Sequence, residues 1–127
     1  GDAHFLALAS FYGVDTTSEI VRFNEANNQF QSFQNITTSG AIDLEYFEIG
    51  NASFIAVANN NARSAIYWFN DATQQFESVV EDIDTTRARE WEHFTVGDVD
   101  YLAVASWLFG GSAGSLDIYQ CNAFCFS

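Results

Sequence analysis

The sequence predicts an all-β fold built from four-stranded antiparallel sheets, the blades of a β-propeller, with about two and a half blades in the chain. The first observation is an apolar phrase that occurs three times, at Phe5–Ser10, Phe54–Asn59 and Tyr101–Ser106, with starts 49 residues apart (5 to 54) and 47 apart (54 to 101). The second is that each phrase is apolar at successive positions, as in a strand buried on both faces. Repeats of roughly 40 to 50 residues that hold four short strands are typical of propeller blades, which stack face to face.

The middle repeat is complete and defines the expected blade. Its inner strand runs through the hairpin turn at Gly50 and Asn51 into the apolar phrase. β-branched and aromatic residues indicate a third strand, and a polar turn leads from it to an outer strand. The four strands of this blade are therefore expected at residues 41–49, 53–59, 64–70 and 76–83.

The first and third repeats match this blade only in part. The first opens inside the turn before its apolar phrase, so it lacks an inner strand, and two further strands are expected at residues 19–24 and 30–36. The third has an inner strand at 88–97, a Gly- and Ser-rich loop, and a third strand at 118–122. The single segment 1–127 is thus divided into a partial blade at 1–36, a full blade at 37–83 and a partial blade at 84–127.

The composition predicts a folded protein with an acidic surface. Of the 127 residues, 48% are hydrophobic and 13 are Phe, which excludes a disordered chain. The 17 acidic residues outnumber four Arg, with no Lys, and give a net charge of −13. This charge excludes nucleic acid and anionic membranes as partners, and no apolar run is long enough for membrane insertion. It favours cations or a basic partner, although solubility alone would also explain it.

Several features favour a secreted, extracellular protein. No signal peptide remains, and a chain that begins at Gly1 looks like a mature or processed product, although a trimmed chain would look the same. Two triplets permit N-glycosylation, at Asn35 and Asn51. The two cysteines, Cys121 and Cys125, make a poor zinc site, which leaves a local disulfide, a link to another chain or free thiols open.

The repeated motif resembles the epilepsy-associated repeat (EAR), also called the epitempin (EPTP) repeat. The matching features are Phe-x-Ile/Val-Gly at 47–50 and 94–97, the apolar phrase that follows, and Ser-x-Ile-Tyr-x-Phe at 64–69 with a further Phe downstream. Repeats of this kind occur in the leucine-rich glioma-inactivated proteins and in some large adhesion receptors and matrix-like proteins. Residues 37–83 form one full copy and partial copies flank it, so the resemblance covers nearly the whole chain.

The resemblance implies a secreted seven-bladed propeller that binds proteins at the cell surface and has no catalytic activity. With fewer than three blades, this chain would expose two blade faces and two sheet edges. We therefore expect homo-oligomerisation into a closed ring, and a dimer would give six blades. A fragment of a longer precursor is the rival interpretation.

Two acidic positions are candidates for a metal site. Asp43 and Glu90 occupy the same position of the inner strand in successive repeats. The resemblance implies that acidic residues near here can line the central channel and hold calcium. Calcium takes six to eight oxygen ligands, so ligands from several blades would suit it. Glu45 and Glu92 form a second acidic pair, again on the inner strand of successive repeats. For them a simpler interpretation than metal binding is that their carboxylates are solvated or hydrogen-bonded at the start of the strand.

Aromatic residues that follow the apolar phrase are candidates for ligand binding. Loops after blade strands lie on the rim of a propeller, where ligands commonly bind. Exposed aromatic side chains there would serve protein, glycan or apolar ligands, or the contact between chains. The residues concerned are Phe11, Tyr12, Trp107, Leu108 and Phe109. By contrast, the positions of His4 and His93 hold chemically different residues in the other repeats, so both are interpreted as ordinary packed or turn residues. No Ser, His and Asp are placed as a catalytic triad.

The sequence therefore predicts a secreted, self-associating, non-catalytic binding protein that recognises a protein or glycan at the rim or at the channel mouth. The alternative is a small apolar molecule or pigment bound between associated chains, which co-purified absorbance would reveal. A hydrolase is the third hypothesis, and it would need carboxylates that converge in a cleft.

Overall fold

The computed structural model of the chain describes residues 4–11, 16–60, 62–83, 85, 87–107 and 114–121, with only the main chain at 80–83. Ten strands in these residues form three antiparallel sheets, which confirms the all-β prediction. The N-terminal sheet has β1 (Phe5–Leu8), β2 (Thr16–Asn24) and β3 (Gln29–Thr38). The central sheet has β4 (Ala41–Ile49), β5 (Ala52–Asn59), β6 (Ser64–Asn70) and β7 (Gln75–Ile83). The C-terminal sheet has β8 (Ala88–Val96), β9 (Val99–Ser106) and β10 (Ser115–Cys121).

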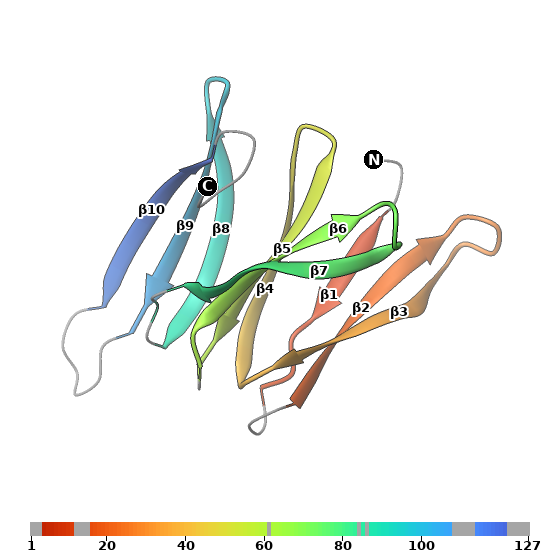
Figure 1. The fold of residues 1–127 in the computed structure, drawn as a ribbon, viewed down its shortest axis with the longest axis horizontal. Helices are drawn as coiled ribbons and strands as arrows, with labels where there is room; N and C mark the ends of the chain where they lie inside the picture. The colour runs from red at the N-terminus through yellow and green to blue at the C-terminus, as the bar shows by residue number, and fades with distance from the viewer. Residues whose placement is uncertain are drawn as a thin grey trace.

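The three sheets lie in chain order, with the four-stranded central sheet between the two three-stranded ones (Figure 1). Each sheet is a meander whose neighbouring strands are consecutive in sequence. This is the arrangement expected of successive propeller blades, while closure into a ring stays a prediction. No helix capable of spanning a membrane occurs in the part of the chain that the structure describes.

The predicted strands of the middle repeat match the central sheet to within one residue at each end. β4 and β6 have the predicted bounds, and β5 and β7 each begin one residue earlier. The tight turns before the apolar phrases use Gly50 (φ 60°) and Gly97 (φ 62°), in the left-handed region that glycine tolerates best.

Two strands of the partial repeats begin three residues earlier than predicted. β2 starts at Thr16 because Thr16 and Thr17 continue the pairing with the end of β3. β10 starts at Ser115 because it pairs with β9 as far as Ser106. In both cases a polar start that reads as loop in the sequence is held in the sheet by its neighbouring strand.

The apolar phrase of the middle repeat is buried on both faces, as its sequence predicts. Phe54, Ala56 and Ala58 belong to the cluster shared with the C-terminal sheet, whose largest member is Trp91. Ile55 and Val57 belong instead to the cluster shared with the N-terminal sheet. Full burial of a side chain such as Ile55 stabilises the fold by about 1.5–3 kcal/mol, so β5 anchors both neighbouring sheets.

Hydrogen bonds from side chains to the main chain also join the sheets. The Gln34 carboxamide donates from Nε2 to the Phe76 carbonyl oxygen (2.9 Å), and its Oε1 accepts from the Phe76 amide (2.8 Å). Oδ2 of Asp43 accepts a bond from the Trp91 amide at 2.9 Å. These contacts fix the N-terminal sheet to β7 and the inner strand β4 to the inner strand β8.

A buried pair of hydroxyl groups recurs within two of the sheets. Ser18 and Thr38 are 2.9 Å apart between their side-chain oxygens, and Thr85 donates a bond of 2.7 Å to Ser64. All four side chains are almost fully buried, and main-chain bonds add to the pairs, because Ser18 Oγ accepts from the Ser10 amide and Thr85 Oγ1 accepts from the Ser64 amide.

Candidate functional site

The inner strands bring four carboxylates together, two from β4 and two from β8. Asp43 and Glu45 lie on β4, and Glu90 and Glu92 lie on β8, which contacts β4. The pKa of Glu45 is raised to about 7, first by burial and then by the charges of Glu92, Asp43 and Glu90. This surface therefore carries concentrated negative charge, which a cation or a basic side chain would neutralise.

The predicted metal pair, Asp43 and Glu90, is only part of what a calcium ion needs. Asp43 already uses Oδ2 to accept the Trp91 amide, while Glu90 is exposed. Among the described residues, no three His, Cys, Asp or Glu side chains are grouped in a way that could hold a metal ion. Calcium at this position would need further oxygen ligands, and it stays a prediction.

The predicted aromatic residues do not all come together. Phe11 follows β1 and is 51% exposed, and Trp107 follows β9 and is 49% exposed. The central sheet lies between the two sheets that carry them (Figure 1), so they belong to two separate patches. Tyr12, Leu108 and Phe109 lie outside the described residues.

Arg89 is a partner of Trp107 that the sequence analysis missed. Its guanidinium carbon lies 4.4 Å from the centroid of the Trp107 ring, within the range of a cation–π interaction. The Trp107 amide donates to the Arg87 carbonyl oxygen at 3.1 Å, which fixes the main chain beneath the ring. The sequence gives no simple signal for this pair, because Ala88 pairs with Ser106 and this puts Arg87 opposite Trp107, while Arg89 lies where the register shifts between Ala88 and Glu90.

A hollow at the end of the β2–β3 hairpin is a second feature without a sequence prediction. It has a volume of about 450 Å³, and the Arg22 guanidinium beside it lies 5.5 Å from the Phe5 centroid and 5.7 Å from the Phe33 centroid. The hollow offers one cation, aromatic edges and amide groups to a small polar ligand. Its lining consists of Arg22, Phe23, Asn24, Glu25, Gln31, Ser32 and Phe33.

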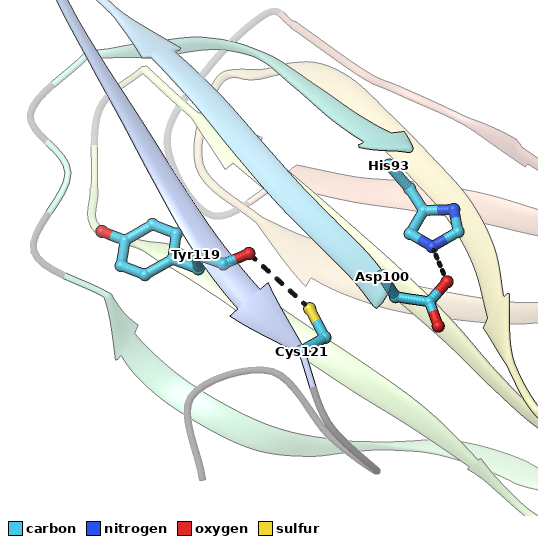
Figure 2. Close-up of polar contacts among 4 residues, drawn as sticks. All are labelled: His93, Asp100, Tyr119 and Cys121. Atoms are coloured by element: carbon cyan, nitrogen blue, oxygen red, sulfur yellow. Dashed lines mark hydrogen bonds and ion pairs between the residues drawn. The ribbon is translucent and has the colours of Figure 1, made fainter. Parts of the chain in front are cut away.

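His93 has a specific partner at the β8–β9 hairpin (Figure 2). Its Nε2 lies 2.9 Å from Oδ1 of Asp100, and its ring stacks on Phe47 with centroids 5.1 Å apart. In the β4–β5 hairpin the same two positions hold Tyr46 and Ser53, whose hydroxyl groups are 3.1 Å apart. Both residues of the contact therefore change from one repeat to the next, and each repeat keeps a polar contact between the two strands of the hairpin, next to the core.

Cys121 is buried at 2% exposure and is disulfide-bonded. Its Sγ lies 4.0 Å from the Tyr119 carbonyl oxygen (Figure 2), and a disulfide sulfur has no hydrogen to donate there. Cys125, the other member of the predicted pair, lies outside the described residues. The glycosylation candidates Asn35, on β3, and Asn51, in the β4–β5 turn, are both exposed, and their modification stays a prediction.

Comparison with known proteins gives a consistent family assignment. The family model of the EPTP domain matches residues 29–68 and 78–113, together more than half of the chain. The human "thrombospondin-type laminin G domain and EAR repeat-containing protein" is 36% identical over 121 residues, and so is its mouse counterpart. Each alignment covers 88% of this chain but only 18% of the relative, so the chain spans less than a fifth of the curated relatives that it matches.

Proposed function

We propose, because the chain belongs to the EPTP family of EAR-repeat proteins, that it is a secreted, non-catalytic domain that binds a protein or glycan ligand. The family resemblance implies recognition without catalysis, which makes the hydrolase hypothesis the weakest of the three. Secretion is supported by the disulfide at Cys121, since such bonds persist in oxidising compartments, and by the exposure of both glycosylation candidates.

The stacked pair Arg89 and Trp107 is the observation that supports this function best. Trp and Arg are the residue types most enriched at the energetic centre of protein interfaces. Half of the Trp107 side chain is exposed, yet a main-chain hydrogen bond and the guanidinium stack already hold its position. A side chain that is ordered before binding loses little conformational entropy when a ligand packs on it.

The charge distribution indicates which partners would approach this surface. A net charge of −13 steers basic proteins toward the molecule and repels acidic ones. The carboxylates around Glu45 would accept a cation, so calcium is part of the proposal, with Asp43 and Glu90 among its ligands. Association of the chain with itself also remains a prediction.

The test is binding of the purified protein to intact cells and to an array of glycans. Trp107→Ser and Arg89→Gln should each weaken binding by about tenfold or more, as expected for a central contact. Phe30→Ser is the matched control, because Phe30 is equally exposed (53%) but lies on β3, in another sheet. The proposal fails if Trp107→Ser binds like the unmodified protein, or if Phe30→Ser loses as much.

The same assay separates the role of calcium from that of the surface around Arg89 and Trp107. Removal of calcium with a chelator should weaken binding if the inner-strand carboxylates hold an ion that the ligand needs. Asp43→Asn and Glu90→Gln should then abolish the effect of the chelator without changing the effect of Trp107→Ser. If the chelator does not change binding but Trp107→Ser still weakens it, calcium is removed from the proposal and ligand binding at Trp107 is kept.

A further inference from the structure

The hollow at the end of the β2–β3 hairpin has the size of a ligand site. All of its lining residues come from β2, β3 and the turn between them. Its volume of about 450 Å³ lies within the range of roughly 300–1,000 Å³ that is typical of small-molecule sites. Arg89 and Trp107 belong to the C-terminal sheet and its end, so the hollow is a separate candidate site.

Arg22, the cation of this hollow, faces the central sheet. It pairs with Phe5 across β1 and β2, and residues directly opposite each other in an antiparallel pair share a face of the sheet. Phe5 belongs to the core cluster shared with the central sheet, and Phe33 packs against the same cluster. The Arg22 guanidinium carbon lies 5.5 Å from the Phe5 centroid and 5.7 Å from the Phe33 centroid. The packing between the N-terminal and central sheets therefore sets the position of this cation.

The Arg22 guanidinium has unused hydrogen-bonding capacity. It is partly buried and carries five N–H donors, yet it makes no hydrogen bond or ion pair with any residue that the structure describes. Gln31 lies directly opposite Arg22, and within the same residues only its Oε1 is bonded, to Asn24 Nδ2 at 3.0 Å. The hollow is thus rich in donors, so it suits a ligand with acceptor oxygens and a negative charge.

The matching hairpin of the central sheet contains a carboxylate that this hairpin lacks. There, Asn70 Nδ2 donates to Glu77 Oε2 at 3.1 Å, in the same way as Asn24 Nδ2 donates to Gln31 Oε1. The bonds from Asn70 and Thr73 hold the pKa of Glu77 below its usual range. In the β2–β3 hairpin an uncharged amide replaces this carboxylate, directly opposite an arginine. The replacement leaves the hairpin with a cation and no internal anion to neutralise it.

We propose that the hollow binds the carboxylate of an acidic sugar, a uronic or sialic acid unit of a glycan. The carboxylate pairs with the Arg22 guanidinium, whose planar fork of donors matches a carboxylate. The free Nε2 group of Gln31 donates to a sugar oxygen, and the aromatic lining suits the C–H groups of a sugar ring. The hollow is larger than a bare carboxylate requires, which favours a sugar over a simple organic acid.

This interaction depends on direct contact with Arg22. The chain has a net charge of −13, so its long-range field repels an anionic sugar, and pairing at short range has to offset that repulsion. Glu25, an exposed carboxylate in the lining, adds to the repulsion. The inference goes beyond the proposed function, because it concerns another sheet from Trp107, and either proposal can fail without the other.

The experiment titrates the 127-residue protein with glucuronate, N-acetylneuraminate, glucose or acetate and follows the main-chain amides by NMR. Glucose is the matched control for glucuronate, because the two sugars differ only in the carboxylate, and acetate is the carboxylate without the sugar. We expect one of the acidic sugars to shift the amides of residues 22–25 and 31–33 and to bind at least about tenfold more tightly than glucose and acetate. Tighter binding of glucuronate identifies a uronic acid as the ligand, and tighter binding of N-acetylneuraminate identifies a sialic acid.

Three variants locate the contact. Arg22→Gln should weaken binding of the acidic sugar at least about tenfold, because it removes the charged fork. Glu25→Gln should strengthen binding about twofold, because it removes a like charge from the lining. Arg63→Gln is the control, since it removes the same charge from an exposed arginine between β5 and β6 and should leave binding unchanged. Urea denaturation of each variant checks that the fold is kept.

The ligand comparison uses the unmodified protein, so it tests the proposal even if a variant fails to fold. Absence of binding by both acidic sugars, or glucose binding as tightly as glucuronate, would overturn the proposal. So would acetate binding as tightly as the sugars, or amide shifts confined to other residues. Folded Arg22→Gln that binds like the unmodified protein, or Arg63→Gln that loses as much, would also overturn it.

Discussion

Gln34 offers the sharpest test of how the sheets are held together. Its carboxamide makes two hydrogen bonds to the main chain of Phe76, at 2.9 and 2.8 Å, in a partly buried position between β3 and β7. Gln34→Leu keeps the approximate shape of the side chain and removes both bonds. At about 0.5–1.5 kcal/mol per bond, the free energy of unfolding should fall by about 1–3 kcal/mol.

Urea denaturation measures this loss as a midpoint lower by about 1 M with an unchanged slope. Gln75→Leu is the control, because its carboxamide donates on the surface to the neighbouring Gln74 carbonyl oxygen, and its effect should stay within about 0.5 kcal/mol. If Gln34→Leu costs no more than this control, the two bonds do not stabilise the contact between the sheets.

Gln34→Glu adds a pH dependence whose sign follows from the geometry. The carboxylate keeps an acceptor for the Phe76 amide but replaces the donor with an oxygen that faces the Phe76 carbonyl. The folded state should therefore raise the pKa of the new carboxyl group above its value of about 4.3 in the unfolded chain, and the lost stability should return as the pH falls through the raised pKa and be complete below about 4. A difference from the unmodified protein that stays constant between pH 7 and pH 3 would contradict this account.

Three further predictions concern single sites. Ser64→Ala should lower the free energy of unfolding by about 1–3 kcal/mol, because it leaves the buried Thr85 hydroxyl without its acceptor, and in a double-mutant cycle Thr85→Val should then cost less than it does alone. Glu45→Gln should raise the denaturation midpoint at pH 8 and change it little at pH 4, because the pKa of Glu45 is raised from 4.5 to about 7 and its ionisation destabilises the fold as the pH rises between these values. Gly97→Ala should cost about 1–2 kcal/mol in the same assay, a conformational cost alone, since the added Cβ would meet no atom within 4 Å.

The strands could be predicted from the sequence because their signals are local and repeated. The bounds of β4 follow from its hairpin turn and its apolar ends, and a repeat with the same residue types confirms the assignment. Asp43 and Glu90 could be matched by their spacing, and Trp107 by its place after the apolar phrase. Matching residues between repeats in this way predicts where each residue lies in the fold, but it does not predict which side chains it contacts.

The contacts that were missed depend on how strands and sheets face each other. Compared position by position, His93 replaces Tyr46 and Asp100 replaces Ser53, and neither replacement looks meaningful alone. Only the cross-strand register shows that the two residues of each repeat contact each other. Gln34 gives no signal at all, because its bond to Phe76 depends on the distance between stacked sheets. That distance is set by the packing of all the core side chains and not by any short motif.

The bonds that join neighbouring sheets at Gln34 and Asp43 have a consequence for how such a repeat can diverge. In both cases one sheet supplies a side chain and the next supplies only its main chain. Every residue except proline presents the same amide and carbonyl, so these bonds place no demand on the receiving side chains, and Phe76 and Trp91 are constrained by their burial in the core instead. The constraint that comes from each hydrogen bond therefore falls on one side chain only, and a change of side chain at the receiving position that keeps the core packed leaves the bond in place.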